Sequence, residues 1–218
     1  LNVLEACANR NSRRIFYSSS ACMYPQRNQL DPANPNCAED SAYPADPDSE
    51  YGWEKLFSER LYMAFARNKG METRIARYHN IFGPEGSWND GREKAPAAVC
   101  RKVIHAKETG ATEIEIWGDG KQTRSFMYID DCIYGIDRIM HSDIIEPLNL
   151  GSSELVSINQ LVDIAEEIAG IKVNRRYKLD APKGVNGRNS DNTLIHQHLG
   201  WEPSIRLRDG MAKTFAWI

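Results

Sequence analysis

In the first third of the chain, the pattern of apolar positions is first that of a strand, then that of a helix, and then that of a second strand. The segment 13–18 is short and contains aromatic and β-branched residues. This composition predicts a buried strand that ends in serines. Residues 49–68 have helical spacing with Gly70 as the expected stop, and residues 73–80 predict a second strand. The inner face of this helix is expected to carry the apolar positions 53, 56, 57, 61, 64 and 65. Strand, loop, helix and strand in this order favour a parallel α/β sheet.

After residue 83 the pattern changes to shorter elements. A polar loop covers residues 86–94, and the earlier segment 21–48 is rich in Pro, Asn and Asp, a composition typical of a long functional loop. The pattern predicts helices at 95–106, 130–140 and 157–169, strands at 114–117, 124–128, 148–150 and 173–179, and two short helices around 200–203. The second half is therefore expected to form a smaller α+β region packed on the sheet domain.

The beginning of the chain is unusual for a folded element. Leu1 to Ala8 has the apolar spacing of a helix interior, and no N-cap residue precedes it. We therefore expect that the chain starts within an element and that further residues precede Leu1.

The composition restricts the class of partner. The 218 residues carry a formal net charge of −3, which gives no electrostatic basis for nucleic acid as the main partner. No apolar run approaches the roughly 20 residues that span a bilayer.

Five cysteines without a Cys-x-x-Cys pair favour reduced thiols in a cytoplasmic protein. His196 and His198 lack further ligands at zinc-site spacing, so we predict no metal site and expect both on a surface helix.

Tyr51 and Lys55 form the first candidate site. They are four positions apart on the predicted helix and therefore project from the same face. A nearby ammonium group can favour the phenolate, which serves as a base toward a sugar hydroxyl. Ser18 to Ser20 and His79 to Asn80 end the two strands, and an open parallel sheet binds ligands beyond its carboxyl ends. The sequence thus predicts one crevice between these strand ends and the helix.

Several motifs together resemble the extended short-chain dehydrogenase/reductase family. They are Ser-Ser-Ala-x-x-Tyr at 19–24, Tyr-x-x-x-Lys at 51–55, Arg-Tyr-x-Asn-x-Phe-Gly-Pro at 77–84, Trp-Gly-Asp-Gly at 117–120 and Leu-Gly-Trp at 199–201. The resemblance implies an α/β fold with a Rossmann-like parallel sheet, NAD as cofactor and a homodimer. It also implies that residues 1–83 are the C-terminal half of the NAD-binding domain. Residues 84–218 would mainly bind the nucleotide sugar, with about 124–150 returning to the first domain.

The same resemblance implies roles for individual residues. Catalysis would involve Ser20, Cys22, Tyr51, Lys55 and Lys94, and the cofactor would contact Tyr51, Lys55 and Tyr78. Substrate contacts would come from Ser20, Ala21, Cys22, Asn80, Glu93, Lys94, Ala95, Lys102, Gln122, Thr123, Arg124 and Arg188. Arginine suits the diphosphate of a nucleotide because its planar fork donates two parallel hydrogen bonds.

Three further segments, 19–25, 91–98 and 187–192, resemble one group within this family more closely. Its members invert the configuration at two carbons of a GDP-linked hexose. GDP-mannose or a related nucleotide sugar is therefore the expected substrate. Oxidation at C4 makes the hydrogens on C3 and C5 acidic, and inversion requires acid/base groups on both sides of the ring. The resemblance gives these roles to Cys22 and Lys94. The other four cysteines are expected to be structural.

Other classes of function stay open at this point. A nucleotide-sugar 4-epimerase or dehydratase of the same family would keep Tyr51 and Lys55 without needing Cys22 and Lys94. A non-catalytic protein that binds a nucleotide sugar or NAD could share the fold. The glycine-rich fingerprint for the pyrophosphate of NAD is absent from the 218 residues and is expected upstream of Leu1. We therefore expect this piece to bind NAD poorly and to turn over little.

Overall fold

The main sheet is parallel and has three strands. A computed structural model describes residues 1–218, and its sheet has the order β1 (Arg14–Ser20), β2 (Glu72–His79) and β7 (Leu148–Gly151). All neighbours in this sheet run in the same direction, with Ser20 beside Tyr78 at the carboxyl end. The predicted parallel α/β fold is therefore confirmed. Strand β7 comes from the second half of the sequence, and the division of the chain into two domains stays a prediction.

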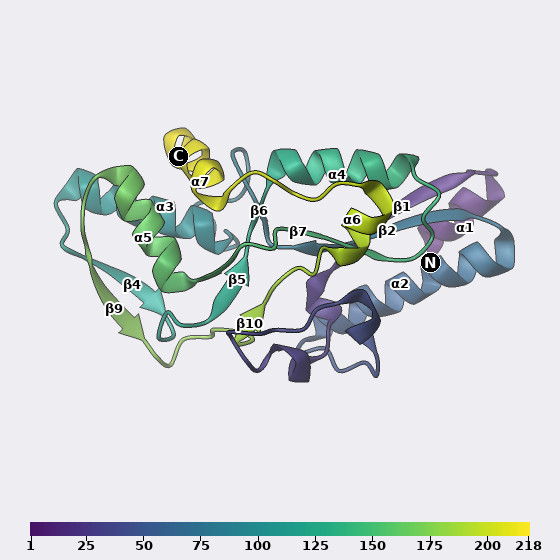
Figure 1. Ribbon diagram of the computed structural model, residues 1–218, viewed down its shortest axis with the longest axis horizontal. Coiled ribbons are helices and arrows are strands. Elements are labelled where there is room, and N and C mark those ends of the chain that lie inside the picture. The colour runs from purple at the N-terminus through teal and green to yellow at the C-terminus, as the bar shows by residue number, and fades with distance from the viewer.

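Helices cover both faces of this sheet (Figure 1). Helix α2 (Glu50–Lys69) packs on β1 and β2 from one side, next to the short helix α1 (Asn2–Asn9), and α4 (Ile129–His141) packs from the other. The start of α2 is fixed by Ser49, whose hydroxyl oxygen accepts from the Gly52 amide at 3.2 Å. Its end falls at Gly70 with a left-handed φ of 65°, as the sequence predicts.

The predicted inner face of α2 is partly wrong. Trp53 and Phe57 are 46% and 66% exposed, whereas the side that faces the sheet buries Gly52, Leu56 and Glu59. The physical reason is that the inner side is partly polar, because Glu59 forms a buried ion pair with an arginine of β2. Two aromatic side chains that were expected in the core, Trp53 and Phe57, thus lie on the outer side of the helix.

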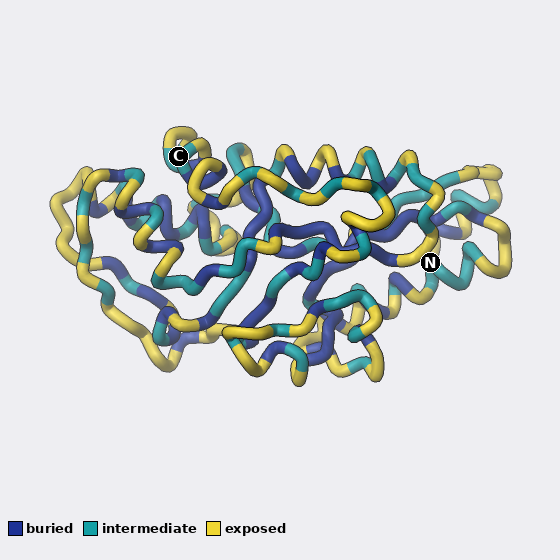
Figure 2. Tube along the Cα trace, in the orientation of Figure 1, coloured by how far each residue is buried: buried dark blue, intermediate teal, exposed yellow.

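A second core lies at the other end of the elongated molecule (Figures 1 and 2). It packs α3 (Ala95–Thr109), α5 (Ile158–Ala169) and α7 (Leu207–Trp217) together with the parallel pair β4 (Glu113–Trp117) and β9 (Asn174–Lys178). A capping box at Ser157 starts α5, and Gly170 ends it. Helix α6 (Thr193–Leu199) carries His196 and His198, both exposed as expected.

The strand expected at 124–128 is divided in two. Strand β5 (Thr123–Ser125) pairs with β8 (Leu155–Ser157) and β10 (Gly187–Arg188), while β6 (Met127–Tyr128) pairs with β3 (Ile81–Phe82). The break falls at Phe126, whose ring is buried in the second core. The first two residues of the segment 187–192 thus form a strand.

The long segment after β1 is less irregular than the sequence suggests. It contains three 3₁₀ turns and buries Tyr24, whose hydroxyl donates to Asn149 of β7 at 2.8 Å. The turns are η1 (Ala21–Met23), η2 (Gln26–Gln29) and η3 (Glu39–Ala42). All five cysteines are free. None of the helices combines the length and the apolar composition needed to cross a bilayer.

Candidate functional site

The carboxyl end of β1 meets the first turn of α2. The hydroxyl oxygen of Ser20 accepts from the Cys22 amide at 3.2 Å, which fixes the turn η1. A Cβ at Gly52 would lie 2.3 Å from the carbonyl oxygen of Cys22, so only glycine permits this approach. The sequence therefore places Tyr51 directly beside the turn that carries Ser20 and Cys22, as expected.

Tyr51 and Lys55 share one face of α2. The Lys55 ammonium donates to the carbonyl oxygen of Ser18 at 3.1 Å and lies 5.5 Å from the centre of the Tyr51 ring. Tyr51 is half exposed. Burial raises the pKa of its phenol, and a hydrogen bond with Ser20 opposes this rise. The lowering that we expected from Lys55 is therefore not seen in the chain alone.

Tyr78, on the neighbouring strand, is connected to Lys55 through Ser18. Its hydroxyl accepts from Ser18 at 3.4 Å. Burial raises the pKa of Tyr78 to about 12, so its phenol stays protonated at neutral pH. Tyr78 therefore offers a protonated phenol as a hydrogen-bond donor at the strand ends.

Arg188 is the cation that contacts the Cys22 thiol. Its Nη1 lies 3.0 Å from Sγ of Cys22, and its Nε donates to Gln29 at 2.5 Å. The guanidinium is almost fully buried, and its Nη2 has no hydrogen-bond partner. One carboxylate oxygen of Asp48 lies 3.8 Å from Nη2. The cation in contact with the Cys22 thiol is therefore Arg188.

Arg124 lies directly beside Arg188, because β5 and β10 pair these two positions in register. Its hydrogen bonds all go to carbonyl oxygens, those of Thr123, Lys183 and Val185, at 2.7 to 3.2 Å. Burial, followed by repulsion from Arg188, lowers the pKa of Arg124 to about 10. Two adjacent guanidinium groups with little counter-charge form a site suited to an anion.

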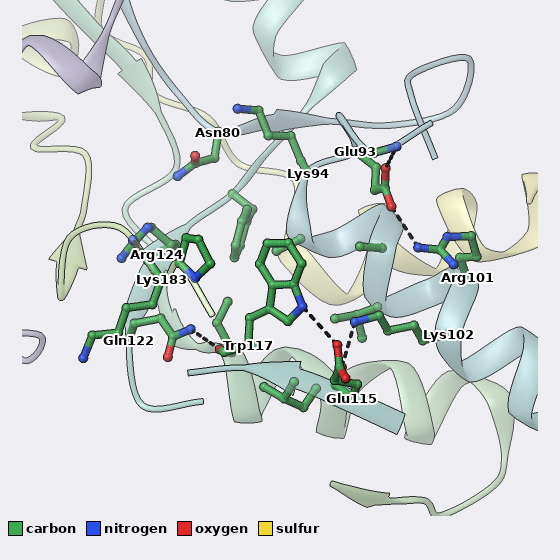
Figure 3. Close-up of a pocket in the computed structure, with 18 residues that line it drawn as sticks. Asn80, Glu93, Lys94, Arg101, Lys102, Glu115, Trp117, Gln122, Arg124 and Lys183 are labelled. Atoms are coloured by element: carbon green, nitrogen blue, oxygen red, sulfur yellow. Dashed lines mark hydrogen bonds and ion pairs between the residues drawn. The ribbon is translucent and has the colours of Figure 1, made fainter. Parts of the chain in front are cut away.

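A pocket extends from Arg124 toward α3 and β4 (Figure 3). Seven residues predicted to contact substrate line it: Asn80, Glu93, Lys94, Ala95, Lys102, Gln122 and Arg124. The Lys94 side chain extends on the same side as Asn80 in this view, at the start of α3. The structure therefore brings these seven residues, which come from positions 80 to 124, to one cavity.

Several of these side chains are held in place by the fold. Asn80, between β2 and β3 in the sequence, has a left-handed φ of 46°, and its side-chain amide donates to the carbonyl oxygen of Ser125 on β5 at 3.0 Å. The Glu93 carboxylate accepts from Arg101 at 2.8 Å and from the Gly91 amide at 2.7 Å. The carboxylate of Glu93 thus shapes the loop before Lys94, whose amine is exposed.

Other predicted residues lie outside this pocket. The Thr123 hydroxyl donates to the Pro32 carbonyl oxygen at 2.5 Å, and Ala21 is buried in η1. Ser20, Cys22, Tyr51, Lys55, Tyr78 and Arg188 form a separate cluster at the strand ends, which Arg124 connects to the pocket. The cooperation of Cys22 with Lys94 stays a prediction.

Sequence reasoning missed four charged or aromatic residues that line the pocket: Arg101, Glu115, Trp117 and Lys183. Alternation along β4 was the available signal for two of them. Ile114 and Ile116 are buried, so Glu115 and Trp117 project from the opposite side of the strand.

Comparisons with known proteins show the family of the chain. The model of the NAD dependent epimerase/dehydratase family matches residues 1–151, so the chain belongs to this family. It is 46% identical over 217 residues to GDP-mannose 3,5-epimerase of Arabidopsis thaliana, and the match covers 100% of this chain and 56% of the relative. The chain therefore spans a little over half the length of this relative.

The chain is also similar to a rice protein and to a solved structure. GDP-mannose 3,5-epimerase 1 of Oryza sativa subsp. japonica is likewise 46% identical, with 56% of its length covered. UDP-glucose 4-epimerase from Thermotoga maritima, solved with UDP-glucose, superposes with a TM-score of 0.87 at 25% identity. That match covers 99% of this chain and 66% of the epimerase.

Proposed function

We propose that the protein is a GDP-mannose 3,5-epimerase that uses NAD. The observation that carries this proposal is the cross-strand pair Arg124 and Arg188, which lies between the Cys22–Tyr51 cluster and the pocket. Burying two adjacent guanidinium groups is costly unless an anion compensates them. The diphosphate of a nucleotide sugar provides that charge, and the free Nη2 of Arg188 provides a donor for it.

This placement orients the substrate. With the diphosphate at the arginine pair, the hexose lies toward Tyr51 and Cys22, and the nucleoside extends into the pocket. Asn80 and Lys94 lie where the sugar and the pocket meet. The 46% identity to the Arabidopsis thaliana GDP-mannose 3,5-epimerase supports GDP-mannose as the sugar nucleotide.

The strand ends fit the nicotinamide end of NAD. Lys55 and Tyr78 offer an ammonium and a protonated phenol to ribose hydroxyls, and Tyr51 is half exposed beside them. Bound at Lys55 and Tyr78, NAD would supply reversible hydride transfer at C4 of the hexose. The side chains of the protein move the protons.

The residues act in a definite order in this mechanism. Tyr51 accepts the proton of the C4 hydroxyl, with Ser20 hydrogen-bonded to it and the Lys55 ammonium 5.5 Å from its ring centre. The new C4 carbonyl makes the hydrogens on C3 and C5 acidic. Cys22, with Arg188 beside its sulfur, and Lys94 remove and supply these protons on opposite sides of the ring.

Solvent deuterium tests the proposal in the complete protein. With GDP-mannose and NAD in heavy water, we expect deuterium at both C3 and C5. Cys22→Ala should abolish this exchange while C4 oxidation persists, and Cys7→Ala is the matched control that leaves it unchanged. A nucleotide-sugar 4-epimerase or a binding protein incorporates no deuterium at C3 or C5, and that result would refute the proposal.

We also infer a homodimer formed through α2. Its outer side presents Trp53 and Phe57, which line a shallow groove with Tyr43, Leu56 and Arg60. A second copy of the same helix covers these aromatic side chains by a self-complementary contact. Light scattering should give twice the chain mass, and Phe57→Glu should give the monomer. A monomeric unsubstituted protein would contradict this inference.

We also propose a cytoplasmic location, which the five free thiols support.

A further inference from the structure

The far end of the pocket is built by β4 and α3. Trp117 lines it with 51% of its surface exposed, an unusual position for an indole. Its Nε1 donates to the Glu115 carboxylate at 3.1 Å, which fixes the ring plane. The Lys102 ammonium donates to the backbone carbonyl oxygen of Glu115 at 2.7 Å. These three residues, which we call the far-end cluster, lie together in Figure 3.

The Glu115 carboxylate still has acceptor capacity. One oxygen accepts from Trp117, and the other lies 3.2 Å from Nη2 of Arg176 on β9. An ionised carboxylate has about four acceptor sites, so about two stay available. The side chain is 31% exposed and lines the pocket. Lys102 has further N–H donors, since only one hydrogen bond of its ammonium is used within the chain.

The position of the far-end cluster relative to the arginine pair matches the layout of a nucleoside diphosphate. Figure 3 shows Arg124 on one side of Trp117, with Glu115 and Lys102 on the other. A ligand whose diphosphate occupies Arg124 and Arg188 therefore brings its base to the indole. Stacking on an aromatic side chain is open to every base, so the polar groups decide which base is preferred.

We propose that the far-end cluster selects guanine, with Trp117 stacking on the base, Glu115 accepting from its N1–H and N2–H groups and Lys102 donating to O6. This inference rests on the proposed nucleotide-sugar function. Guanine offers two adjacent donors to one carboxylate, beside an acceptor for the ammonium. Uracil offers a single N–H between two carbonyl oxygens, and adenine has an acceptor at N1. A bidentate contact of this kind discriminates strongly between bases.

Glu113→Gln is the matched control that separates a purely structural role of Glu115 from a role in binding the base. Glu113 on the same strand also binds Arg176, at 2.9 Å, but does not line the pocket. Arg176 therefore loses one carboxylate partner in either Glu113→Gln or Glu115→Gln. Only the second substitution replaces an acceptor in the pocket by an amide that carries its own donors.

Calorimetric titration of the chain with GDP and with UDP tests the inference. We expect GDP to bind more tightly, and Glu115→Gln to weaken GDP by about tenfold or more while leaving UDP unchanged. Glu113→Gln should change neither, and Trp117→Ala should weaken both nucleotides. Equal losses of GDP affinity in the two glutamine variants, or equal GDP and UDP affinity in the unsubstituted chain, would overturn guanine selection while nucleotide binding persists. Binding of neither nucleotide would instead remove the proposed function itself.

Discussion

His79 should make the fold sensitive to acid. The residue ends β2 and is fully buried, with Nε2 3.0 Å from Oδ1 of Asn149. The amide nitrogen of Asn149 donates to the carbonyl oxygens of Cys37 and Asp191, so Oδ1 is the acceptor and Nε2 of His79 carries the proton. Nδ1 has no partner. Protonating it would bury an unpaired charged N–H, and burial accordingly lowers the pKa of His79 to about 3.

The sign and size of the effect follow from this shift. Above pH 6.5 the imidazole is neutral in both the folded and the unfolded chain. Below it, the unfolded chain binds a proton that the folded chain excludes, so the free energy of unfolding falls by roughly 1.4 kcal/mol per pH unit until pH approaches 3. Between about pH 6.5 and pH 4.5 the loss is roughly 2 to 3 kcal/mol, a large part of the stability of an ordinary domain.

Urea unfolding followed by tryptophan fluorescence measures this loss. His79→Gln keeps an N–H donor but does not titrate, so the difference in unfolding free energy between the original chain and this variant should change by that amount over the same range. The carboxyl groups contribute equally to the pH dependence of both proteins, so their contribution cancels in the difference. His196→Gln, on exposed α6, is the matched control and should leave the pH dependence unchanged. Parallel pH curves for the original chain and His79→Gln would refute the reasoning.

Substitutions at three further positions test contacts around the site by urea unfolding. Gly52→Ala places a Cβ 2.3 Å from the Cys22 carbonyl oxygen and should cost about 1 to 3 kcal/mol; an unchanged midpoint would show that the turn moves freely. Asn80→Ala, at a φ of 46°, should cost about 1 to 2 kcal/mol and Asn80→Gly less, and the reverse order would exclude backbone strain. Glu59→Gln leaves buried Arg77 without its charge partner and should cost about 3 to 5 kcal/mol, whereas a loss under 1 kcal/mol would contradict that pairing.

Local patterns were sufficient to predict most elements. Helix α2 and its stop at Gly70 follow from spacing and from the left-handed conformation that glycine adopts readily. Its orientation did not follow, because the pattern treats Trp53 and Phe57 as core residues. The buried side instead contains Glu59, whose partner Arg77 lies on another element. An ion pair between distant segments leaves no periodic signal in the sequence.

The site was predictable to a similar degree. Tyr51, Lys55 and Ser20 share a local neighbourhood that strand and helix order determine. The contact of Arg188 with Cys22 depends on β10 pairing beside β5, a long-range register that no local pattern gives. Glu115 and Trp117 were missed for a related reason, since alternation tells which side of a strand they occupy but not what lies there.

Asn149 joins several segments that surround the site. Its side chain contacts Tyr24 and His79, its amide nitrogen reaches two separate loops, and its backbone N–H donates to Glu39 at 2.8 Å. One buried side chain thus joins the segment after β1, the strand β2 and the segment that carries Arg188. These segments therefore constitute one cooperative unit, and their amide hydrogens should exchange with solvent in a common opening event instead of as independent surface loops.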